Sequence, residues 1–270
     1  MADTHLIFFP PTKNRADAIA AGFRFGHIGT HTSRTIMLDE LAGTFTAVPL
    51  TGRPPAYAAA IVEENCLRKQ TVSTRRLTLQ RLRELYALDP AVPVFRILRR
   101  LWDLDEQSRP LVALLVSLAR DPLLLASAEV VVGMPDGSEF QRTAMRDALA
   151  KSVGERLNES TLNKLVRNVA SSWSQSGHLE GRTFKFRRKV RPTPAAAAFG
   201  LYLAHAAGLA VKESFTSGWL KVLDCSESAT LELATAAKRL GILDLSIGGD
   251  VIVLNFDRLD PAFAFSPQGR

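Results

Sequence analysis

The sequence predicts a mainly α-helical protein with two winged helix-turn-helix-like modules, each ending in a short β-hairpin wing. Two observations favour this fold class. Apolar residues recur at helical spacing along most of the 270-residue chain. The order helix, glycine, hairpin also occurs twice, around Gly177 and around Gly241.

Composition narrows the class of protein. Hydrophobic residues make up 46% of the chain and charged residues 23%, as in ordinary folded domains. Cys66 and Cys225 lie too far apart in sequence to suggest a disulfide framework or a metal-binding spacing. The apolar runs 111–119 and 195–211 suit buried helices better than membrane spans, because the first is short and the second contains a histidine and two glycines. We therefore expect a cytoplasmic protein without membrane contact.

Capping residues and prolines divide the chain into four regions: residues 1–31, which carry no clear pattern; 32–108, a helical region; 109–192, the central winged-helix module; and 193–270, a C-terminal winged-helix-like module. The helices expected in the second region run from Thr32 or Ser33 through Leu41, ended by Gly43; from Pro54-Pro55 through 57–67; over 74–87, capped by Ser73; and over 94–102. The central module is expected to hold helices over 109–120 and 139–151, a short strand over 129–132 and a turn at 135–137.

The helix over 74–87 is basic. Residues 68–83 contain six basic residues and no acid. Arg76 and Arg83 share the outer face with Gln80, whereas the apolar positions Leu77, Leu82, Leu85 and Tyr86 face inward. We expect Arg76 and Arg83 to form a second, weaker DNA-binding patch, and a merely solvated arginine face is the alternative.

Residues 160–176 form the most informative helix. Its apolar stripe consists of Leu162, Leu165, Val166, Val169, Ala170 and Trp173. The opposite face carries the candidate DNA-binding residues Lys164, Arg167, Asn168, Ser171, Ser174 and Gln175. No acid interrupts the chain between Glu159 and Glu180, so this face suits a nucleic-acid groove.

A basic wing follows this helix. Gly177 suits a left-handed helix end, and residues 180–182 suit a tight turn. In the run after the turn, Phe184, Phe186 and Val190 are expected to pack, while Lys185, Arg187 and Lys189 point outward. Arg182, Arg188 and Arg191 complete the candidate DNA-binding residues of the wing. Residues 151–191 hold ten basic residues against three acids, so they carry the whole net charge of +7.

The C-terminal region repeats the pattern with the opposite charge. Helices are expected over 193–207, 217–223 and 228–240, followed by a hairpin around Gly248-Gly249-Asp250. Residues 192–270 contain six basic residues and eight acids, a surface that suits protein contact better than phosphate contact.

The sequence carries no convincing catalytic or metal-binding constellation. His27 and His31 are four residues apart, but nearby glycines argue against a helix and no third ligand suggests itself. Ser176 and His178 are near neighbours in sequence, and the motif Gly-x-Ser-x-Gly is absent. We therefore expect a non-enzymatic protein without a cofactor or a metal.

Residues 33–256 resemble the BrxA family of bacteriophage-exclusion (BREX) defence systems. The residues that carry the resemblance are the segments 71–76 (TVSTRR), 118–123 (LARDPL), 160–162 (STL) and 176–181 (SGHLEG). The resemblance implies a non-enzymatic component of a bacterial anti-phage defence system, with affinity for DNA and with other defence proteins as further partners.

The expected function is binding of double-stranded DNA, mainly through its phosphates, by the basic face of the central module. Two alternatives remain open. The basic face could bind an acidic protein partner in a multi-protein complex, or the chain could be an RNA-binding accessory factor.

Overall fold

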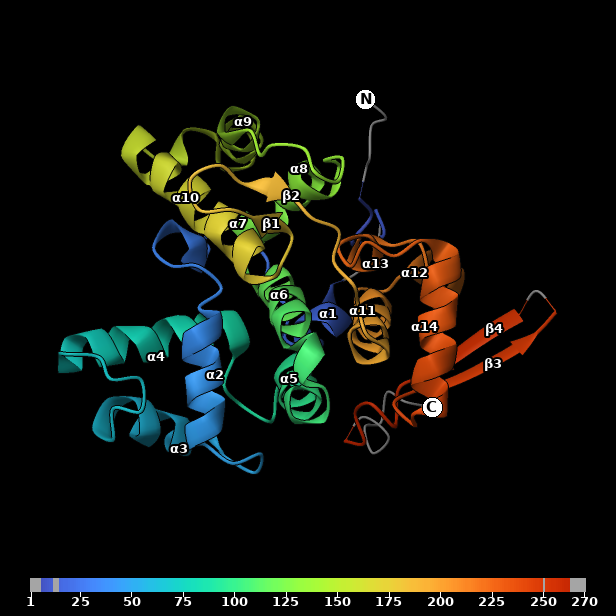
Figure 1. Cartoon of the computed structure of the whole chain (residues 1–270). Coiled ribbons are helices and arrows are strands. Elements are labelled where there is room, and N and C mark those ends of the chain that lie inside the picture. Colours follow the sequence, from blue (N-terminus) through green and yellow to red (C-terminus); the bar gives the residue numbers. More distant parts are fainter. Residues whose placement is uncertain (1–5, 12–14, 250, 263–270) are drawn as a thin grey trace.

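The protein is mainly helical, with two small antiparallel β-hairpins (Figure 1). The computed structural model describes residues 6–11, 15–249 and 251–262. Helix α6 (Arg109–Arg120) runs through the middle of the fold, and its residues from position 111 onward are all buried. The helical part of the predicted fold class is confirmed.

The first part of the chain forms short helices, of which α4 and α5 pack against α6. Their bounds are α1 (Ala16–Ala21), η1 (Thr30–Thr32), α2 (Leu38–Ala47), α3 (Pro54–Ala58), the π-helical turn η2 (Ala59–Glu63), α4 (Val72–Tyr86) and α5 (Pro93–Leu104). The N-cap of α4 is Thr71, whose Oγ1 accepts the Thr74 backbone N–H at 3.1 Å, so the prediction of Ser73 as the cap is wrong. Leu77 was expected inside but is exposed.

The helix expected from residue 32 or 33 begins later. Helix α2 starts at Leu38 and continues through Gly43, the residue predicted to end it. The backbone N–H of Ile36 donates to Ser172 Oγ, and that of Leu38 donates to Gln175 Oε1, each at 3.0 Å. Because side chains of a distant helix accept these bonds, a tertiary contact replaces the local capping signal.

The central module contains α6 and the elements α7 (Pro122–Leu125), α8 (Ala128–Val132), α9 (Arg142–Val153), α10 (Glu159–Gln175), β1 (Leu179–Glu180) and β2 (Phe186–Arg187). The strand expected over 129–132 is wrong, because this valine-rich run forms α8. Glu139 makes the strand contact instead, as an antiparallel bridge to Phe186. A helix satisfies its own backbone groups, whereas a strand needs a free edge beside it.

A hairpin follows α10 as predicted, but its turn spans residues 181–185 and not 180–182, because Glu180 already pairs with Phe186. Leu179 pairs with Arg187 and Glu180 with Phe186, so β2 lies between β1 and Glu139. Gly177 ends α10 with a φ of +87°, as its left-handed role predicts. Gly181 has a φ of +114°, and a Cβ atom there would lie 2.0 Å from the Phe184 carbonyl oxygen. The turn therefore requires glycine.

The C-terminal part also ends in a hairpin. Its elements are α11 (Pro194–Ala206), α12 (Val211–Ser214), α13 (Gly218–Lys221), α14 (Glu227–Arg239), β3 (Asp244–Gly248) and β4 (Val251–Asn255). Figure 1 shows β3 and β4 projecting from α14. The predicted second occurrence of helix, glycine and hairpin is confirmed, although Asp250 of the predicted turn lies outside the described residues.

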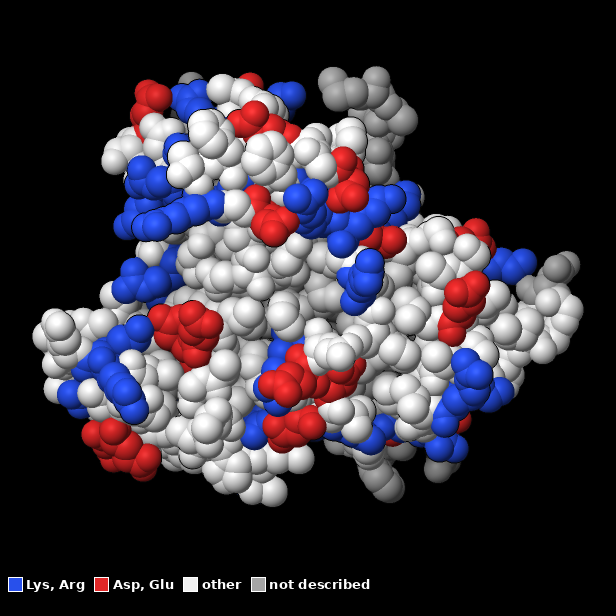
Figure 2. Space-filling view, viewed as in Figure 1, with Lys and Arg blue, Asp and Glu red and all other residues white. Residues whose placement is uncertain are grey.

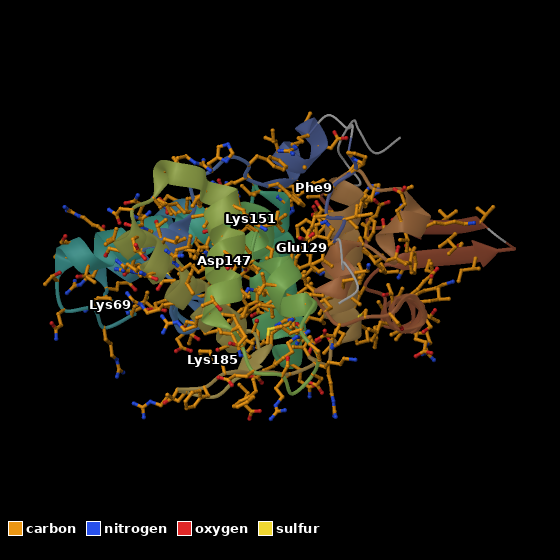
Figure 3. The ribbon with its side chains drawn as sticks, turned by 90° about the horizontal axis from the view of Figure 1, so that it is seen from above. Phe9, Lys69, Glu129, Asp147, Lys151 and Lys185 are labelled. Carbon is orange, nitrogen blue, oxygen red and sulfur yellow. The ribbon has the colours of Figure 1, made fainter. Side chains whose placement is uncertain are left out.

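The N-terminal segment, for which the sequence predicts no secondary structure, packs on the C-terminal helices. The Trp219 indole N–H donates to the Phe8 carbonyl at 2.9 Å, and the Gly218 N–H donates to the Ile7 carbonyl at 2.7 Å. Figure 3 shows Phe9 where this segment meets the C-terminal part. Buried apolar residues from position 6 to position 259 form one cluster, so the two ends of the chain share a core.

In the described part of the chain, no single helix is long and apolar enough to cross a membrane.

Candidate nucleic-acid interface

Helix α10 buries the predicted stripe. All six apolar residues of that stripe are buried, and Trp173 is fully enclosed. Its indole N–H donates to Ser127 Oγ at 2.8 Å, so the ring also has a polar partner. Asn158 caps the helix by accepting the Thr161 N–H at 2.8 Å. The orientation of α10 derived from the sequence is confirmed.

Only some of the polar side chains of α10 are free of hydrogen bonds to other parts of the protein that the structure describes. Asn168 Nδ2 donates to the His31 carbonyl at 2.8 Å, and Gln175 accepts the Leu38 N–H. These two side chains therefore hold the segment before α2 and the first residue of that helix. Lys164 and Arg167 are exposed, in contrast, and extend from the side of the helix that this segment leaves uncovered. Two of the predicted contact residues thus have structural partners.

The remaining polar residues of α10 form a strip that leads to the wing. Ser171 Oγ lies 3.4 Å from Gln175 Nε2, and Ser174 Oγ accepts from Lys185 Nζ at 2.8 Å. Lys185 also donates to the Gly181 carbonyl at 3.1 Å. The strip and the wing are therefore in direct contact.

The expected alternation of the wing is reversed at three positions. Arg187, predicted to point outward, is only 1% exposed, whereas Phe184 is 64% exposed. The Arg187 guanidinium forms an ion pair with Asp224 and donates from Nε to the Val131 carbonyl at 2.9 Å. A buried arginine faces the core here because a buried carboxylate lies opposite it, 37 residues along the chain. Phe186, also expected to pack, is 39% exposed.

The last basic residues of the wing are exposed. Arg188 forms an exposed ion pair with Glu180 at 2.6 Å. The Lys189 backbone N–H donates to Asp136 at 3.0 Å while its side chain is exposed, as is that of Arg191.

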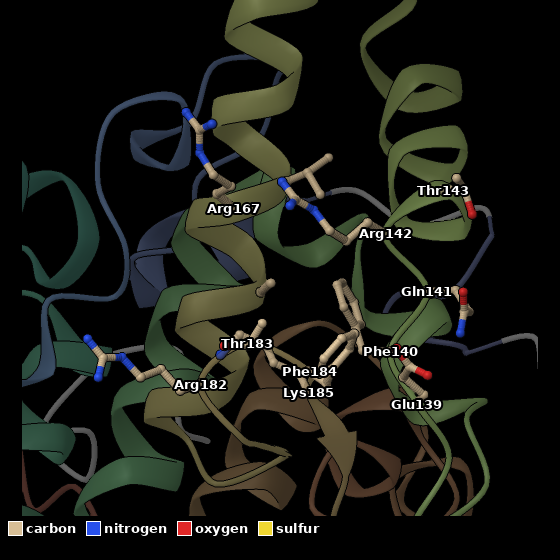
Figure 4. Close-up of a pocket in the computed structure, with 12 residues that line it drawn as sticks. Glu139, Phe140, Gln141, Arg142, Thr143, Arg167, Arg182, Thr183, Phe184 and Lys185 are labelled. Atoms are coloured by element: carbon tan, nitrogen blue, oxygen red, sulfur yellow. The ribbon is translucent and has the colours of Figure 1, made fainter.

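A groove of about 570 Å³ lies between the start of α9, the part of α10 that holds Val166, Arg167 and Ala170, and the turn of the wing. Figure 4 shows these three elements around it. Its basic lining residues are Arg142, Arg167, Arg182 and Lys185. Glu139 is the single acid of the lining. Figure 2 shows lysine and arginine side chains gathered over the region of α10 and β2.

Sequence reasoning missed Arg142 and Phe184 as groove residues. Arg142 occupies the first turn of α9, where the helix dipole disfavours a positive charge. That unfavourable position is the signal that could have identified it. Phe184 was assigned to the core, and nothing local in an alternating run tells which of its two faces is buried.

Arg76 and Arg83 lie in a different place. They extend from α4 and line a second hollow, whose walls include the end of α6. No residue lines both hollows, so the structure does not bring the two predicted patches into one site.

Asp121, His31 and Ser172 form a buried series of hydrogen bonds with the atom types of a hydrolytic triad. His31 Nδ1 lies 2.8 Å from Asp121 Oδ2, and His31 Nε2 lies 2.9 Å from Ser172 Oγ. Ser172 Oγ also lies 2.8 Å from the Asn168 carbonyl, to which it donates, and it accepts the Ile36 N–H. Neither described hollow is lined by these residues. These hydrogen bonds therefore join the segment before α2 to α6 and α10.

Ser176 Oγ lies 2.9 Å from His178 Nδ1. His178 Nε2 lies 2.7 Å from the Val222 carbonyl, which can only accept, so this nitrogen carries the proton and Nδ1 accepts from Ser176. Both side chains are buried. Within the described residues, no group of three histidine, cysteine or acidic side chains is arranged to hold a metal.

No protein-family model, no curated protein and no solved structure matches the chain.

Proposed function

We propose that the central module is a winged-helix element that binds double-stranded DNA, chiefly through phosphates. The single observation that carries this proposal is the groove in which Arg142, Arg167, Arg182 and Lys185 converge with one acid among them. Charge gathered around one concave site attracts a polyanion, whereas the same charge spread over the surface does not.

The order of elements supports the winged-helix assignment. A strand contact at Glu139, the helices α9 and α10, and the β1–β2 hairpin follow one another along the chain. The hairpin folds back so that β2 pairs with both Glu139 and β1. In winged helix-turn-helix proteins the second helix of this pair and the wing face DNA. The corresponding elements here carry the basic lining of the groove.

The partly covered face of α10 favours binding that tolerates many sequences. Asn168 and Gln175, the amide side chains suited to reading adenine, are bonded to the segment before α2. Arg167 and Lys164 remain exposed, and such charges contact phosphates irrespective of sequence. The proposal is therefore phosphate-based recognition with little selection among bases.

The resemblance to the BrxA family supports a place for this DNA-binding component among the proteins of a BREX defence system. Genes for a methyltransferase and an ATPase beside this one are the expected context. Their absence from the neighbourhood of the gene in several genomes would remove this part of the proposal.

Fluorescence anisotropy with a labelled duplex tests DNA binding. The double variant Arg167→Ala/Arg182→Ala removes two groove charges, and Lys238→Ala/Arg239→Ala removes two exposed charges at the end of α14 as a matched control. We expect only the groove variant to weaken binding and to reduce the salt slope by about 1.8, roughly 0.9 for each lost phosphate contact.

Three results would decide against the proposal. Equal losses in the two variants would indicate non-specific attraction. Tighter binding of RNA than of duplex DNA at equal salt would favour the RNA-binding alternative. The absence of salt-dependent duplex binding, together with capture of an acidic protein through the same groove residues, would favour the adaptor alternative.

A further inference from the structure

A second hollow is lined by four arginines that come from three separate parts of the chain. It has a volume of about 360 Å³ and lies between α4, the end of α6 and the segment after α1. Its basic residues are Arg24, Arg76, Arg83 and Arg120, and Leu79, Gln80 and Glu84 complete the lining. Folding therefore gathers positive charge from residues almost a hundred positions apart.

Arg120 forms the floor of this hollow and is 9% exposed. Its guanidinium donates to the carbonyls of Glu84 and Arg83, each at 3.2 Å, and to the carbonyl of Gly22. All these partners are neutral, so they satisfy N–H donors without cancelling the charge. Burial, with a further contribution from the charge of Arg24, lowers the pKa of Arg120 to about 10. The group is still positively charged at neutral pH.

The other three arginines also lack a carboxylate partner among the described residues. Arg24 donates to the Glu84 carbonyl at 3.0 Å, and Arg83 makes one long contact of 3.4 Å with the Pro54 carbonyl. Arg76 has no described hydrogen bond or ion pair and is exposed, as are Arg24 and Arg83. Three exposed guanidiniums thus line the hollow with a buried one.

The single acid of the hollow is already engaged. The Glu84 carboxylate accepts from Arg81 at 2.7 Å, from Thr30 at 2.9 Å and from Gln80 at 3.0 Å. Arg81 is not part of the lining, so Glu84 is paired with a charge outside the hollow. The positive charge of the four lining arginines is left largely uncompensated.

A structural role accounts for Arg120 but not for its neighbours. Its bonds join the last turn of α4 to the end of α6, where a positive charge also suits the carbonyl end of a helix. Placing Arg24, Arg76 and Arg83 around that charge adds repulsion and no compensating bond to a carboxylate. A hollow lined by like charges attracts an ion of the opposite sign, and a bound anion would offset this repulsion.

We propose that this arginine hollow is a phosphate-binding site. Guanidinium groups pair with phosphate oxygens through two parallel N–H···O bonds, and one buried arginine with three exposed ones beside it can bind such a group from several sides. The phosphate belongs either to a nucleic-acid backbone or to a free phosphate compound. The site is separate from the groove beside α10 and does not depend on duplex binding by that groove.

The test uses the whole chain and the double variant Arg76→Ala/Arg83→Ala, which removes exposed lining residues and leaves the buried Arg120 in place. Lys238→Ala/Arg239→Ala again removes the same charge elsewhere. The first probe is inorganic phosphate, and thermal unfolding in sodium phosphate is compared with unfolding in sodium chloride of equal ionic strength. A ligand that binds only the folded state raises the midpoint temperature. The second probe is a labelled duplex, followed by anisotropy.

We expect the unmodified protein and the control to respond alike, and Arg76→Ala/Arg83→Ala to lose a response. Loss of the phosphate-specific rise assigns the site to a free phosphate compound. Loss confined to duplex affinity, with a salt slope lower by about 1.8, assigns it to a nucleic-acid backbone. Unchanged responses to both probes in the folded variant would overturn the proposal. A phosphate response that needs Arg76 and Arg83 in a protein without duplex affinity would reject the proposed function and retain this site.

Discussion

Arg187 of the wing and Asp224 in the turn after α13 form a buried ion pair that joins the central module to the C-terminal part. The second carboxylate oxygen of Asp224 accepts the Val190 backbone N–H at 2.8 Å. Asp224 therefore holds β2 and the residues after it, while the turn of the wing carries Arg182 and Lys185 toward the groove. A basic residue in a basic segment has a structural role here.

The Arg187–Asp224 pair predicts unequal effects for two adjacent arginines. Arg187→Ala leaves the Asp224 carboxylate buried without its partner, so we expect a loss of about 3 to 5 kcal/mol in unfolding free energy. Arg188→Ala removes an exposed pair with Glu180 and should have a much smaller effect. Urea unfolding of both variants measures the difference. Equal stabilities of the two variants would contradict the assigned role of Arg187.

Truncating the Trp173 side chain is expected to lower the unfolding free energy strongly, because the ring is packed in the core. The ring is fully buried and its N–H is bonded to Ser127, so Trp173→Ala should lower the unfolding free energy by about 3 to 5 kcal/mol. Calorimetry and urea unfolding measure this loss. Trp173→Phe retains most of the apolar volume and serves as the matched variant, with a smaller expected cost. A fully stable Trp173→Ala protein would mean that α10 packs through another face.

Replacing Arg167 is expected to reduce the affinity for duplex DNA without changing the selectivity among DNA sequences. It is exposed on α10 beside the groove, and the amide side chains nearby have structural partners. Arg167→Ala should therefore weaken binding to every duplex by a similar factor, measured by anisotropy on several unrelated sequences. A selection from random duplexes that returned one tight motif, lost on mutation of Arg167, would instead establish sequence-specific recognition.

The buried His178 is expected to make the folded protein less stable in mild acid. Burial, more than the nearby charge of Arg187, lowers the pKa of His178 to about 4. An unfolded histidine titrates near 6.5, so between these values the unfolded state binds a proton that the folded state does not. The contribution of His178 is complete above about pH 6.5 and is lost as the pH falls toward 4, with a slope of up to about 1.4 kcal/mol per pH unit. Urea unfolding at pH 7, 6 and 5 should show this slope, and His178→Gln should flatten it. An equal slope in the variant would assign the acid sensitivity to other groups.

Replacing Gly181 is expected to change the geometry of the wing turn. An added methyl group would meet the Phe184 carbonyl, and the φ of +114° is unfavourable for alanine. Gly181→Ala should displace the turn that carries Arg182 and Lys185, so we expect weaker duplex binding with a smaller loss of global stability than in Trp173→Ala. Gly137→Ala is a suitable comparison, because its φ of +77° is also positive but its Cβ position is open. Equal duplex affinity in the two glycine variants would show that the turn geometry is not needed for binding.

The helices that could be derived from the sequence are those whose signals are local. The apolar stripe of α10, the terminator Gly177 and the helix over 109–120 depend on spacing within one or two turns, and all three are confirmed. The second hairpin follows from alternation around a glycine pair in the same way. Such features need no knowledge of a distant segment.

The tertiary structure decided the features that depend on a partner far along the chain. Helix α2 begins at Leu38, where Ser172 and Gln175 of α10 accept the N–H groups of Ile36 and Leu38, and Arg187 is buried because Asp224 lies opposite it. The sequence by itself determined that the central module is basic and amphipathic. Only the three-dimensional packing determined which of its charges are available, since a side chain's periodicity is local whereas its burial and its counter-charge are not.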